Sequence, residues 1–329
     1  MMASHRKASM KITIVIPCYN EQAVLPELFR RLTASARTWE CDWDVLCVDD
    51  GSSDRSWELL VKQHERDERW RGISLSRNFG HQAALSAGLY HAQGDAVVCL
   101  DADLQDAPEV ILSLIQKWRE GYDVVYGIRR HRKESGVKRM CYWLFYRLLE
   151  RMARTRIPPD SGDFCLMDRR VVEVLRCMPE RNRFVRGLRA WAGFQQVGVE
   201  YERSARAAGE VKYTLRKLMR LAMDGIFSFS TVPLTLVSQA GLWISGLALI
   251  GIVWTLATKL FSEFFAELGF PPVQGFTTIV ICILFLGGIQ LLSIGIIGEY
   301  LGRVYDEVKR RPPWVIATTA GIDARLPDL

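Results

Sequence analysis

Three polar clusters in the N-terminal part of the chain carry the side chains best suited to chemistry. They are residues 19–21 (YNE), 49–52 (DDGS) and 101–106 (DADLQD). Each cluster follows an apolar run rich in β-branched residues, which is typical of a strand buried on both faces of a parallel sheet. Ligands of open α/β sheets bind beyond the carboxyl ends of such strands. We therefore expect the three clusters to form one binding site.

The third cluster contains an Asp-x-Asp pair, Asp101 and Asp103. Alternate residues of an extended segment project to one side, so both carboxylates can face one ligand. Two hard oxygen donors suit Mg²⁺ or Mn²⁺, which keeps other coordination positions for water and phosphate oxygens. A solvated acidic turn would also explain a lone pair, but three clusters at successive strand ends favour a site. Because neither GxGxxG nor GxxxxGK[ST] occurs, a metal and basic side chains must neutralise the phosphates of a diphosphate substrate.

The elements that position these clusters alternate along the sequence. Apolar runs predict strands at 12–18, 72–75 and 123–127 and at the runs VLCV and DAVVCL. Helical patterns fall at about 22–36, 56–67, 82–92 and 108–120, the last opened by Pro108 at a first-turn position. Strands that alternate with helices predict an α/β sheet with helices on both faces.

Two long runs near the C-terminus contain no Asp, Glu, Lys or Arg: residues 225–258 and 268–298. A bilayer core of roughly 30 Å needs about 20 apolar residues per helix, so each run is long enough to span it. Basic residues precede the first run and follow the second, whereas Lys259 is the only Lys or Arg between them. This asymmetry predicts that both termini are cytoplasmic and that a short connection faces outward.

These observations divide the chain into six expected segments. They are a cytoplasmic catalytic domain at 1–213, an amphipathic juxtamembrane helix at 214–231, a first transmembrane helix at 232–258, an external connection at 259–273, a second transmembrane helix at 274–298 and a cytoplasmic C-terminal tail at 299–329.

Residues 129–156 form a basic segment interleaved with aromatic residues. A solvated helix face would explain the charge, but the nearby apolar runs favour a surface for anionic lipid. Nucleic acid is a poor rival as partner, because the charge is concentrated in one segment and no nucleic-acid module is recognisable. The eight cysteines include no CxxC pair, which indicates a reducing compartment and argues against a zinc site.

Several motifs resemble those of family 2 glycosyltransferases that act on polyprenyl phosphates, the group that includes dolichol-phosphate mannose synthase. They are IPCYNE, VDDGSSD, SRNFGHQAALSAG, DADLQDAPE and SGDFCLMDR. The later motifs MPERNRFVRGL, RAAGEVKY, GIFSFSTVPL, ILFLGGIQ and GEYLGR extend the likeness to bactoprenol-phosphate glucosyltransferases of O-antigen modification. The resemblance covers about residues 11–313. It implies a GT-A fold with a mostly parallel sheet, followed by amphipathic juxtamembrane helices and a two-helix transmembrane hairpin.

The resemblance also implies roles for residues on the nucleotide-sugar side. The base pocket is expected to contain Pro17, Tyr19, Glu21 and Asp50. Arg77 and Asn78 match SRNFG and are expected to support the nucleotide. Further donor-side residues are the metal ligands Asp101 and Asp103, then Gln105, and Arg206 and Lys212 in a loop that closes over the diphosphate. Each of these residues could instead have a purely structural role. Pro17 could simply end a strand, the aspartates could be turn residues, and Arg206 and Lys212 could lie in an exposed linker.

On the acceptor side, the resemblance implies roles for Asp163, Arg129 and Arg139. Asp163 matches the GDF motif, whose acid is a candidate base or orienting group. The second pKa of a phosphate monoester is about 6, so the acceptor is largely a dianion at neutral pH. We therefore prefer an orienting role for Asp163 over general-base action. Arg129 and Arg139 are expected to bind the acceptor phosphate, although Lys138 could replace Arg139; Arg183 and Arg186 could also contact substrate.

The expected function is inverting transfer of a hexose, most simply glucose, from a UDP-sugar to undecaprenyl phosphate at the inner face of a bacterial plasma membrane. GDP-mannose or a UDP-amino sugar is the alternative donor, and a catalytically silent membrane scaffold is the alternative class. A processive polysaccharide synthase is disfavoured because no QxxRW motif occurs. Glycine-rich runs near 287–288 and 298–302 suggest close helix packing, and a homo-oligomer is expected.

Overall fold

The structure is a computed structural model that describes residues 10–130, 161–181, 183–202 and 276–323, with scattered positions between 237 and 261. It contains two compact units. One, the sheet unit, comprises Met1–Met219 and Arg310–Leu329. The other, the apolar unit, comprises Arg220–Lys309.

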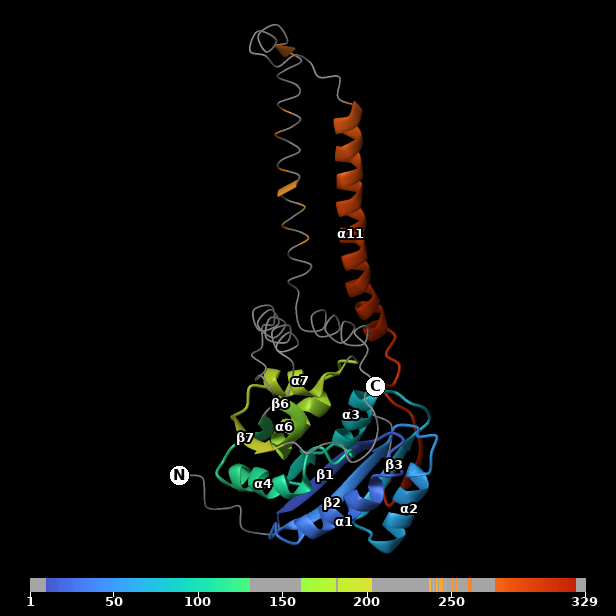
Figure 1. Cartoon of the computed structure of the whole chain (residues 1–329), viewed down its shortest axis with the longest axis vertical. Helices are drawn as coiled ribbons and strands as arrows, with labels where there is room; N and C mark the ends of the chain where they lie inside the picture. The colour runs from blue at the N-terminus through green and yellow to red at the C-terminus, as the bar shows by residue number, and fades with distance from the viewer. Residues whose placement is uncertain are drawn as a thin grey trace. The chain divides into compact units, whose positions relative to one another are not determined.

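An eight-stranded mixed sheet forms the sheet unit (Figure 1), in the order β7-β5-β6-β4-β1-β2-β3-β8. Its strands are β1 Lys11–Cys18, β2 Asp42–Asp49, β3 Trp70–Leu75, β4 Ala96–Cys99, β5 Val124–Arg130, β6 Ser161–Asp168, β7 Gln196–Glu202 and β8 Ile316–Ala320. Four neighbouring pairs are parallel, namely β1–β2, β2–β3, β1–β4 and β5–β7. The pairs β4–β6, β5–β6 and β3–β8 are antiparallel. The α/β class and the first five strands are confirmed, whereas β6, β7 and β8 were not expected.

Helices cover both faces of this sheet, as expected. They are α1 Leu25–Ala36, α2 Ser56–Arg66, α3 His81–His91, α4 Ile111–Arg119, α6 Arg169–Cys177 and α7 Val185–Trp191, with a short 3-10 turn, η1 Pro108–Val110. Ile14 and Ile16 of β1 pack in a cluster with α1 and α4, whereas Val15 between them packs with α3, α6 and α7. Because successive strand residues face opposite sides, a strand with a fully apolar run supplies both cores at once.

The expected helix boundaries shift where proline occurs. The helix expected at 22–36 begins at Leu25, with Pro26 in its first turn, where the missing N–H of proline costs no hydrogen bond. The helix expected at 108–120 begins instead as η1 and continues as α4. These differences leave the carboxyl ends of β1 and β4 followed by short loops.

In the apolar unit, the long helix α11 extends over Phe276–Val308. Its part Phe285–Val308 has a mean hydropathy of 1.4 and is the one helix among the described residues that is long and apolar enough to cross a membrane. Large apolar side chains along it are exposed, including Phe285 and Leu291. The first expected span, 232–258, lies largely outside the described residues. The two-helix hairpin is therefore not confirmed.

Candidate active site

The antiparallel pairing of β4 with β6 brings Asp101 and Asp163 to the same end of one strand pair. The last paired residues are Cys99 of β4 and Cys165 of β6. Asp101 follows Cys99 by two residues, and Asp163 precedes Cys165 by two residues. Because the strands run in opposite directions and side chains alternate between faces, both carboxylates continue the row begun by the two cysteines. The structure thus joins the DADLQD and SGDF motifs, which are far apart in the sequence.

His81 lies between these two carboxylates. Its Nε2 atom is 3.6 Å from Asp101 Oδ1 and 3.7 Å from Asp163 Oδ2, distances of ion pairs rather than of hydrogen bonds. Partial burial lowers the pKa of His81, but the neighbouring Asp163 and Asp101 carboxylates outweigh burial and raise it above its usual value. A cationic imidazole is therefore favoured at the centre of the cluster.

Asp163 is held from three sides. Besides His81, Gln82 donates from Nε2 to Asp163 Oδ2 at 3.1 Å, and Arg186 of α7 approaches Oδ1 at 3.5 Å. Burial raises the pKa of Asp163, but the contact with His81 and the charge of Arg186 outweigh it and hold the pKa well below its usual range. Asp163 is thus a fixed, ionised carboxylate.

The Asp-x-Asp pair lies close to further carboxylates. Burial raises the pKa of Asp101 to about 6; His81 opposes this rise, and nearby carboxylates, Asp163 first, add to it. Asp103 is buried, and its Oδ1 accepts a hydrogen bond from the backbone N–H of Gln105. The two side chains fit a divalent cation, since carboxylate oxygens are its preferred ligands. Within the described ranges no group of three or more potential ligands is preassembled, so substrate oxygens and water would complete the coordination.

The first two clusters also meet, as expected. The backbone N–H of Asn20 donates to Ser52 Oγ at 2.9 Å. The side-chain Oδ1 of Asn20 accepts from the backbone N–H of Ser53 at 2.8 Å. Pro17 pairs with Val48 in the sheet, and the Glu21 amide donates to Ser56 Oγ at 2.9 Å. These contacts join the loops after β1 and β2 into one surface.

Tyr19 projects from this surface, with 47 % of its area exposed. An aromatic ring at a strand end can stack on a base, which agrees with its expected place in the base pocket. The contact with a nucleotide itself stays a prediction for Tyr19, as it does for Pro17 and Glu21.

Asp50 binds the backbone of the 76–80 loop, a structural role in addition to the expected contact with a base. Its two oxygens accept hydrogen bonds from the amides of Phe79 and Gly80, at 2.7 and 2.9 Å. Burial raises the pKa of Asp50, and the two amide hydrogen bonds oppose the rise. Asp50 therefore shapes the 76–80 loop that precedes α3, and its contact with a base stays a prediction.

Two glycines permit this loop geometry. Gly51 has φ of +67°, and a Cβ atom there would lie 2.4 Å from the carbonyl carbon of Arg77. Gly80 has φ of +100° at the start of α3, a conformation that side chains disfavour. The Arg77 guanidinium lies over the Phe79 ring, 4.3 Å from its centroid. The SRNFG motif is thus a shaped loop that leads directly to His81.

The remaining predicted residues are only partly described. β4 and β5 both run antiparallel to β6. The backbone of Arg129, which pairs with Tyr201, therefore lies at the same end of the strands as Asp101. Arg139, with its alternative Lys138, and the loop residues Arg206 and Lys212 lie outside the described residues, as does the side chain of Arg129. Arg183 donates to the carbonyls of Met178 and Leu175, so it fixes the segment before α7.

Sequence reasoning missed His81, Gln82 and Arg189. His81 and Gln82 belong to the quoted motif SRNFGHQAALSAG, and Arg189 directly follows the quoted motif MPERNRFVRGL. Arg189 is 1 % exposed and adds a further cation near Asp163. For His81 and Gln82, the available signal was a polar pair directly after Gly80, at the start of an otherwise Ala-rich helix.

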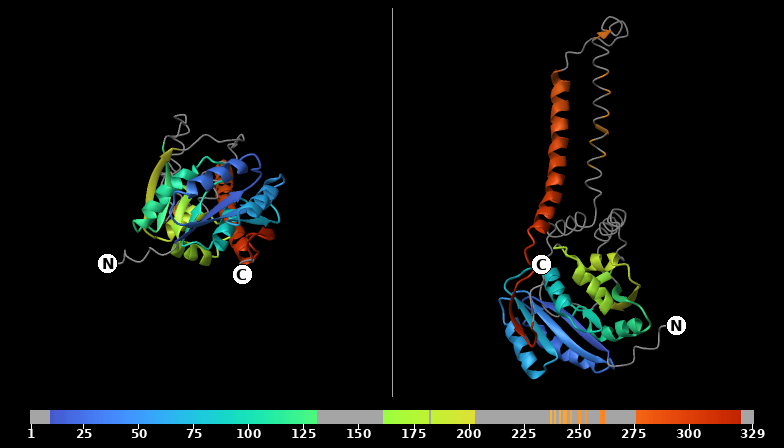
Figure 2. Two further views of the ribbon diagram at one scale, coloured as in Figure 1. Left: turned by 90° about the horizontal axis from the view of Figure 1, so that it is seen from below. Right: turned by 180° about the vertical axis from the view of Figure 1, so that it is seen from behind.

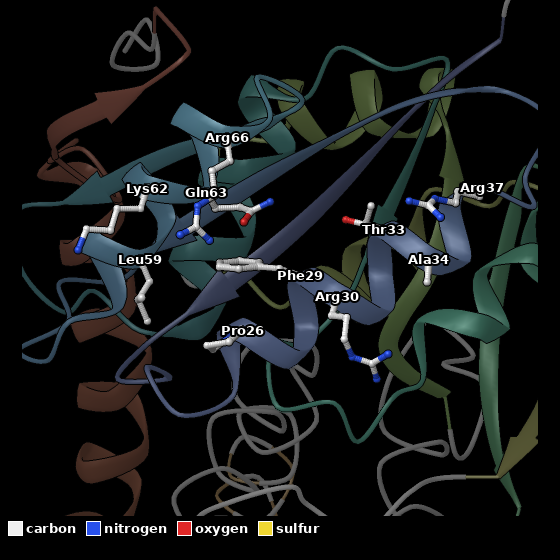
Figure 3. Close-up of a pocket in the computed structure, with 10 residues that line it drawn as sticks. All are labelled: Pro26, Phe29, Arg30, Thr33, Ala34, Arg37, Leu59, Lys62, Gln63 and Arg66. Carbon is white, nitrogen blue, oxygen red and sulfur yellow. The ribbon is translucent and has the colours of Figure 1, made fainter.

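A groove lies between α1 and α2 (Figure 3). This groove of 530 Å³ is lined by apolar Phe29 and Leu59 and by basic side chains including Arg37 and Arg66. Arg37 and Arg66 sit at the carboxyl ends of α1 and α2, where cations offset the partial negative charge of the helix carbonyls. None of its lining residues belongs to the carboxylate cluster.

Comparisons with known proteins place the chain in a family. The family model described as glycosyl transferase family 2 matches residues 13–176. The chain is 45 % identical over 315 residues to the uncharacterized glycosyltransferase YkcC of Bacillus subtilis, covering 95 % of each chain. It is 39 % identical over 309 residues to the bactoprenol glucosyl transferase of Shigella phage SfII, covering 93 % of this chain and 97 % of that one.

A solved structure of glucosyl-3-phosphoglycerate synthase from Mycobacterium tuberculosis is also similar, with a TM-score of 0.46 and 20 % identity, covering 67 % of this chain and 79 % of that one.

The α/β sheet, with an Asp-x-Asp pair beyond the carboxyl end of β4, agrees with the GT-A class that the motifs implied. The chain belongs to glycosyltransferase family 2. The resemblance expected from the motifs is confirmed by the matched domain and by the identities over nearly the whole chain.

Proposed function

We propose that this glycosyltransferase moves a hexose from a nucleoside diphosphate sugar to a polyprenyl phosphate, with UDP-glucose as donor and undecaprenyl phosphate as acceptor. The placement of Asp101, His81 and Asp163 at one edge of the sheet carries this proposal. The 39 % identity to bactoprenol glucosyl transferases, over almost their entire length, supports the acceptor class.

On the donor side, Tyr19 and Glu21 would hold the base and the loops after β1 and β2 the ribose. Asp101 and Asp103 would hold Mg²⁺ or Mn²⁺ against the diphosphate. Such a cation, when bound, stabilises the charge that develops on a leaving diphosphate. Arg206 and Lys212 are proposed to add positive charge from a loop that closes over the same phosphates.

On the acceptor side, Arg129 and Arg139 are proposed to bind the lipid phosphate. The phosphate oxygen attacks the anomeric carbon from the face opposite the diphosphate, so the configuration inverts. Asp163 is a poor base because its pKa is held low, and a phosphate dianion scarcely needs one. Its fixed charge orients His81 and Arg186 instead, which agrees with catalysis by positioning and electrostatic preorganisation.

The fold also supports a membrane location with both chain ends on one side. β8 follows α11 in the sequence, yet it belongs to the same sheet as β1 to β7. If α11 crosses the bilayer once, a second crossing must lie elsewhere between β7 and α11. We propose that the apolar run at 232–258 supplies it, and that the sheet unit and both termini are cytoplasmic, with 214–231 lying along the membrane surface and 259–273 outside. A homo-oligomer stays an expectation.

One experiment tests the proposal. Purified protein in detergent or nanodiscs is incubated with undecaprenyl phosphate and with UDP-glucose, GDP-mannose or UDP-N-acetylglucosamine in turn, and the lipid product is identified by mass. We expect a hexosyl lipid from UDP-glucose. Turnover of another donor alone would reassign the sugar, and release of nucleoside diphosphate that does not depend on the lipid would overturn the acceptor.

A further inference from the structure

The segment after α11 is built into the sheet unit rather than trailing from it. β8 pairs antiparallel with β3, with Gly72 opposite Ala320 and Ser74 opposite Thr318. Figure 2 shows this red strand beside the blue strands of the first half of the chain. Residues 314–320, which we call the C-terminal strap, thus close the edge of the sheet.

Trp314 anchors the C-terminal strap. It is 2 % exposed and packs in one apolar cluster with side chains of β2, β3 and α3, including Ala84 and Ala87 of α3. Its ring centroid is 6.1 Å from that of Tyr90, also in α3, in an edge-on arrangement. A large buried aromatic of this kind fixes the position of the helix against which it packs.

The strap also contacts the loop that leads into the active site. The Ser76 amide donates to the Val315 carbonyl at 2.8 Å, and Phe79 packs against the cluster that contains Trp314. The same loop supplies the two amides that bind Asp50, and it ends at His81. The strap therefore supports both sides of His81: the loop before it and the helix after it.

We propose that the C-terminal strap is a positioning element for the active site, through Trp314 and the 76–80 loop. The kinetic test of this inference rests on the proposed function, whereas its test by hydrogen exchange does not. Trp314 touches no substrate; it holds α3 and the loop so that His81 Nε2 stays between Asp101 and Asp163. The strap that follows the membrane-spanning region is thus required for the catalytic geometry, although no motif of the catalytic sequence lies within it.

The physical basis is packing density. Removing a buried indole leaves a cavity that the surroundings fill only partly, so α3 and the loop gain freedom to move. A misplacement of about 1 Å in a catalytic group can cost roughly 100-fold in rate. The loop also holds Asp50 through the Phe79 and Gly80 backbone amides, so donor binding should weaken together with the rate of transfer.

A matched control exists in Trp39. Trp39 is 0 % exposed and lies in the separate cluster with α1 and α4. As in Trp314, its indole Nε1 has no hydrogen-bond partner among the described residues. Trp314→Ala and Trp39→Ala therefore remove equal side chains of equal burial. We expect both variants to unfold at lower temperature, and both are assayed where circular dichroism shows them folded.

The measurements are kcat and KM for both substrates, UDP affinity by calorimetry, and hydrogen exchange of the peptide that covers residues 76–82. We expect Trp314→Ala to lower kcat about 10- to 100-fold relative to Trp39→Ala, to speed exchange in that peptide, and to weaken UDP binding more than Trp39→Ala does. Trp314→Phe, which keeps an aromatic ring, should restore most of kcat and of the protection.

Equal kcat and equal exchange in the two alanine variants would overturn the inference. If Trp314→Ala does not accumulate as folded protein, Trp314→Phe is compared with Trp39→Phe by the same measurements. If wild-type protein transfers no sugar to polyprenyl phosphate, the proposed function fails, while the exchange comparison still decides whether the strap holds the loop.

Discussion

Gln82 connects Asp163 to the amino end of α7. Its Nε2 donates to Asp163 Oδ2 at 3.1 Å, while its Oε1 accepts from the Val185 amide at 2.9 Å. One side chain at the start of α3 thus fixes both the carboxylate on β6 and the helix that carries Arg186. A glutamine can do this because its amide both donates and accepts.

We predict that Gln82→Ala slows transfer more than it weakens donor binding. A hydrogen bond to a charged group contributes about 1.5–3 kcal/mol, so kcat should fall about 10- to 100-fold. Initial rates and UDP calorimetry measure the two effects. Gln116→Ala, on the exposed side of α4, is the control and should behave as wild type. Unchanged kcat in Gln82→Ala would show that Asp163 needs no help from this bridge.

Asp103→Ala should nearly abolish transfer while the protein stays folded and membrane-bound. The Asp-x-Asp pair is the expected metal site, and metal charge stabilisation is worth several kcal/mol in the transition state. Activity is measured with added Mg²⁺ or Mn²⁺ and in excess chelator, and Mn²⁺ binding by calorimetry. Near-normal activity of the variant, or full wild-type activity in chelator, would remove the metal from the scheme.

Asp101 should destabilise the metal-free fold at neutral pH. Burial raises its pKa to about 6, above the unfolded value of about 3.9. Ionisation therefore weakens the folded state: the penalty is absent below about pH 4, grows between about pH 4 and 6, and is complete above that. The attraction of His81 for Asp101 reduces the net penalty.

Accordingly, Asp101→Asn should raise the free energy of unfolding by roughly 1–3 kcal/mol at about pH 7.5 and by almost nothing at about pH 4. Urea unfolding of metal-free protein at both pH values measures this. An equal gain at both pH values would point to a packing effect of the amide instead.

The pairing of β8 with β3 leads to a prediction about membrane topology. β3 and β8 can pair only if they lie on the same side of the membrane. If α11 and the run at 232–258 each cross it, as proposed, residues 265 and 318 should lie on opposite sides. In a background with all eight cysteines replaced by alanine, single cysteines at Phe265 and Thr318 are treated with an impermeant maleimide on intact cells. We expect Phe265→Cys to react and Thr318→Cys to react only after lysis. Labelling of Thr318→Cys from outside would reverse the orientation.

The α/β class, the places where strands end in carboxylates, and the family could all be predicted from the amino-acid sequence. Those features are local. The run ITIVIPC supplies both faces of a buried strand, and Asp101 and Asp103 are two residues apart. Periodicity and motif spacing carry such information directly, and Pro26 in the first turn agrees with the later start of α1.

Only the tertiary structure decided which distant segments meet. That Asp163 faces Asp101 follows from the antiparallel pairing of β4 with β6, and that the chain end supports the active-site loop follows from the pairing of β8 with β3. His81 and Gln82 acquire their contacts through the same pairings. Strand partners far apart in sequence are chosen by which edges are free and which faces need covering, a balance over the whole sheet that no single stretch of residues encodes.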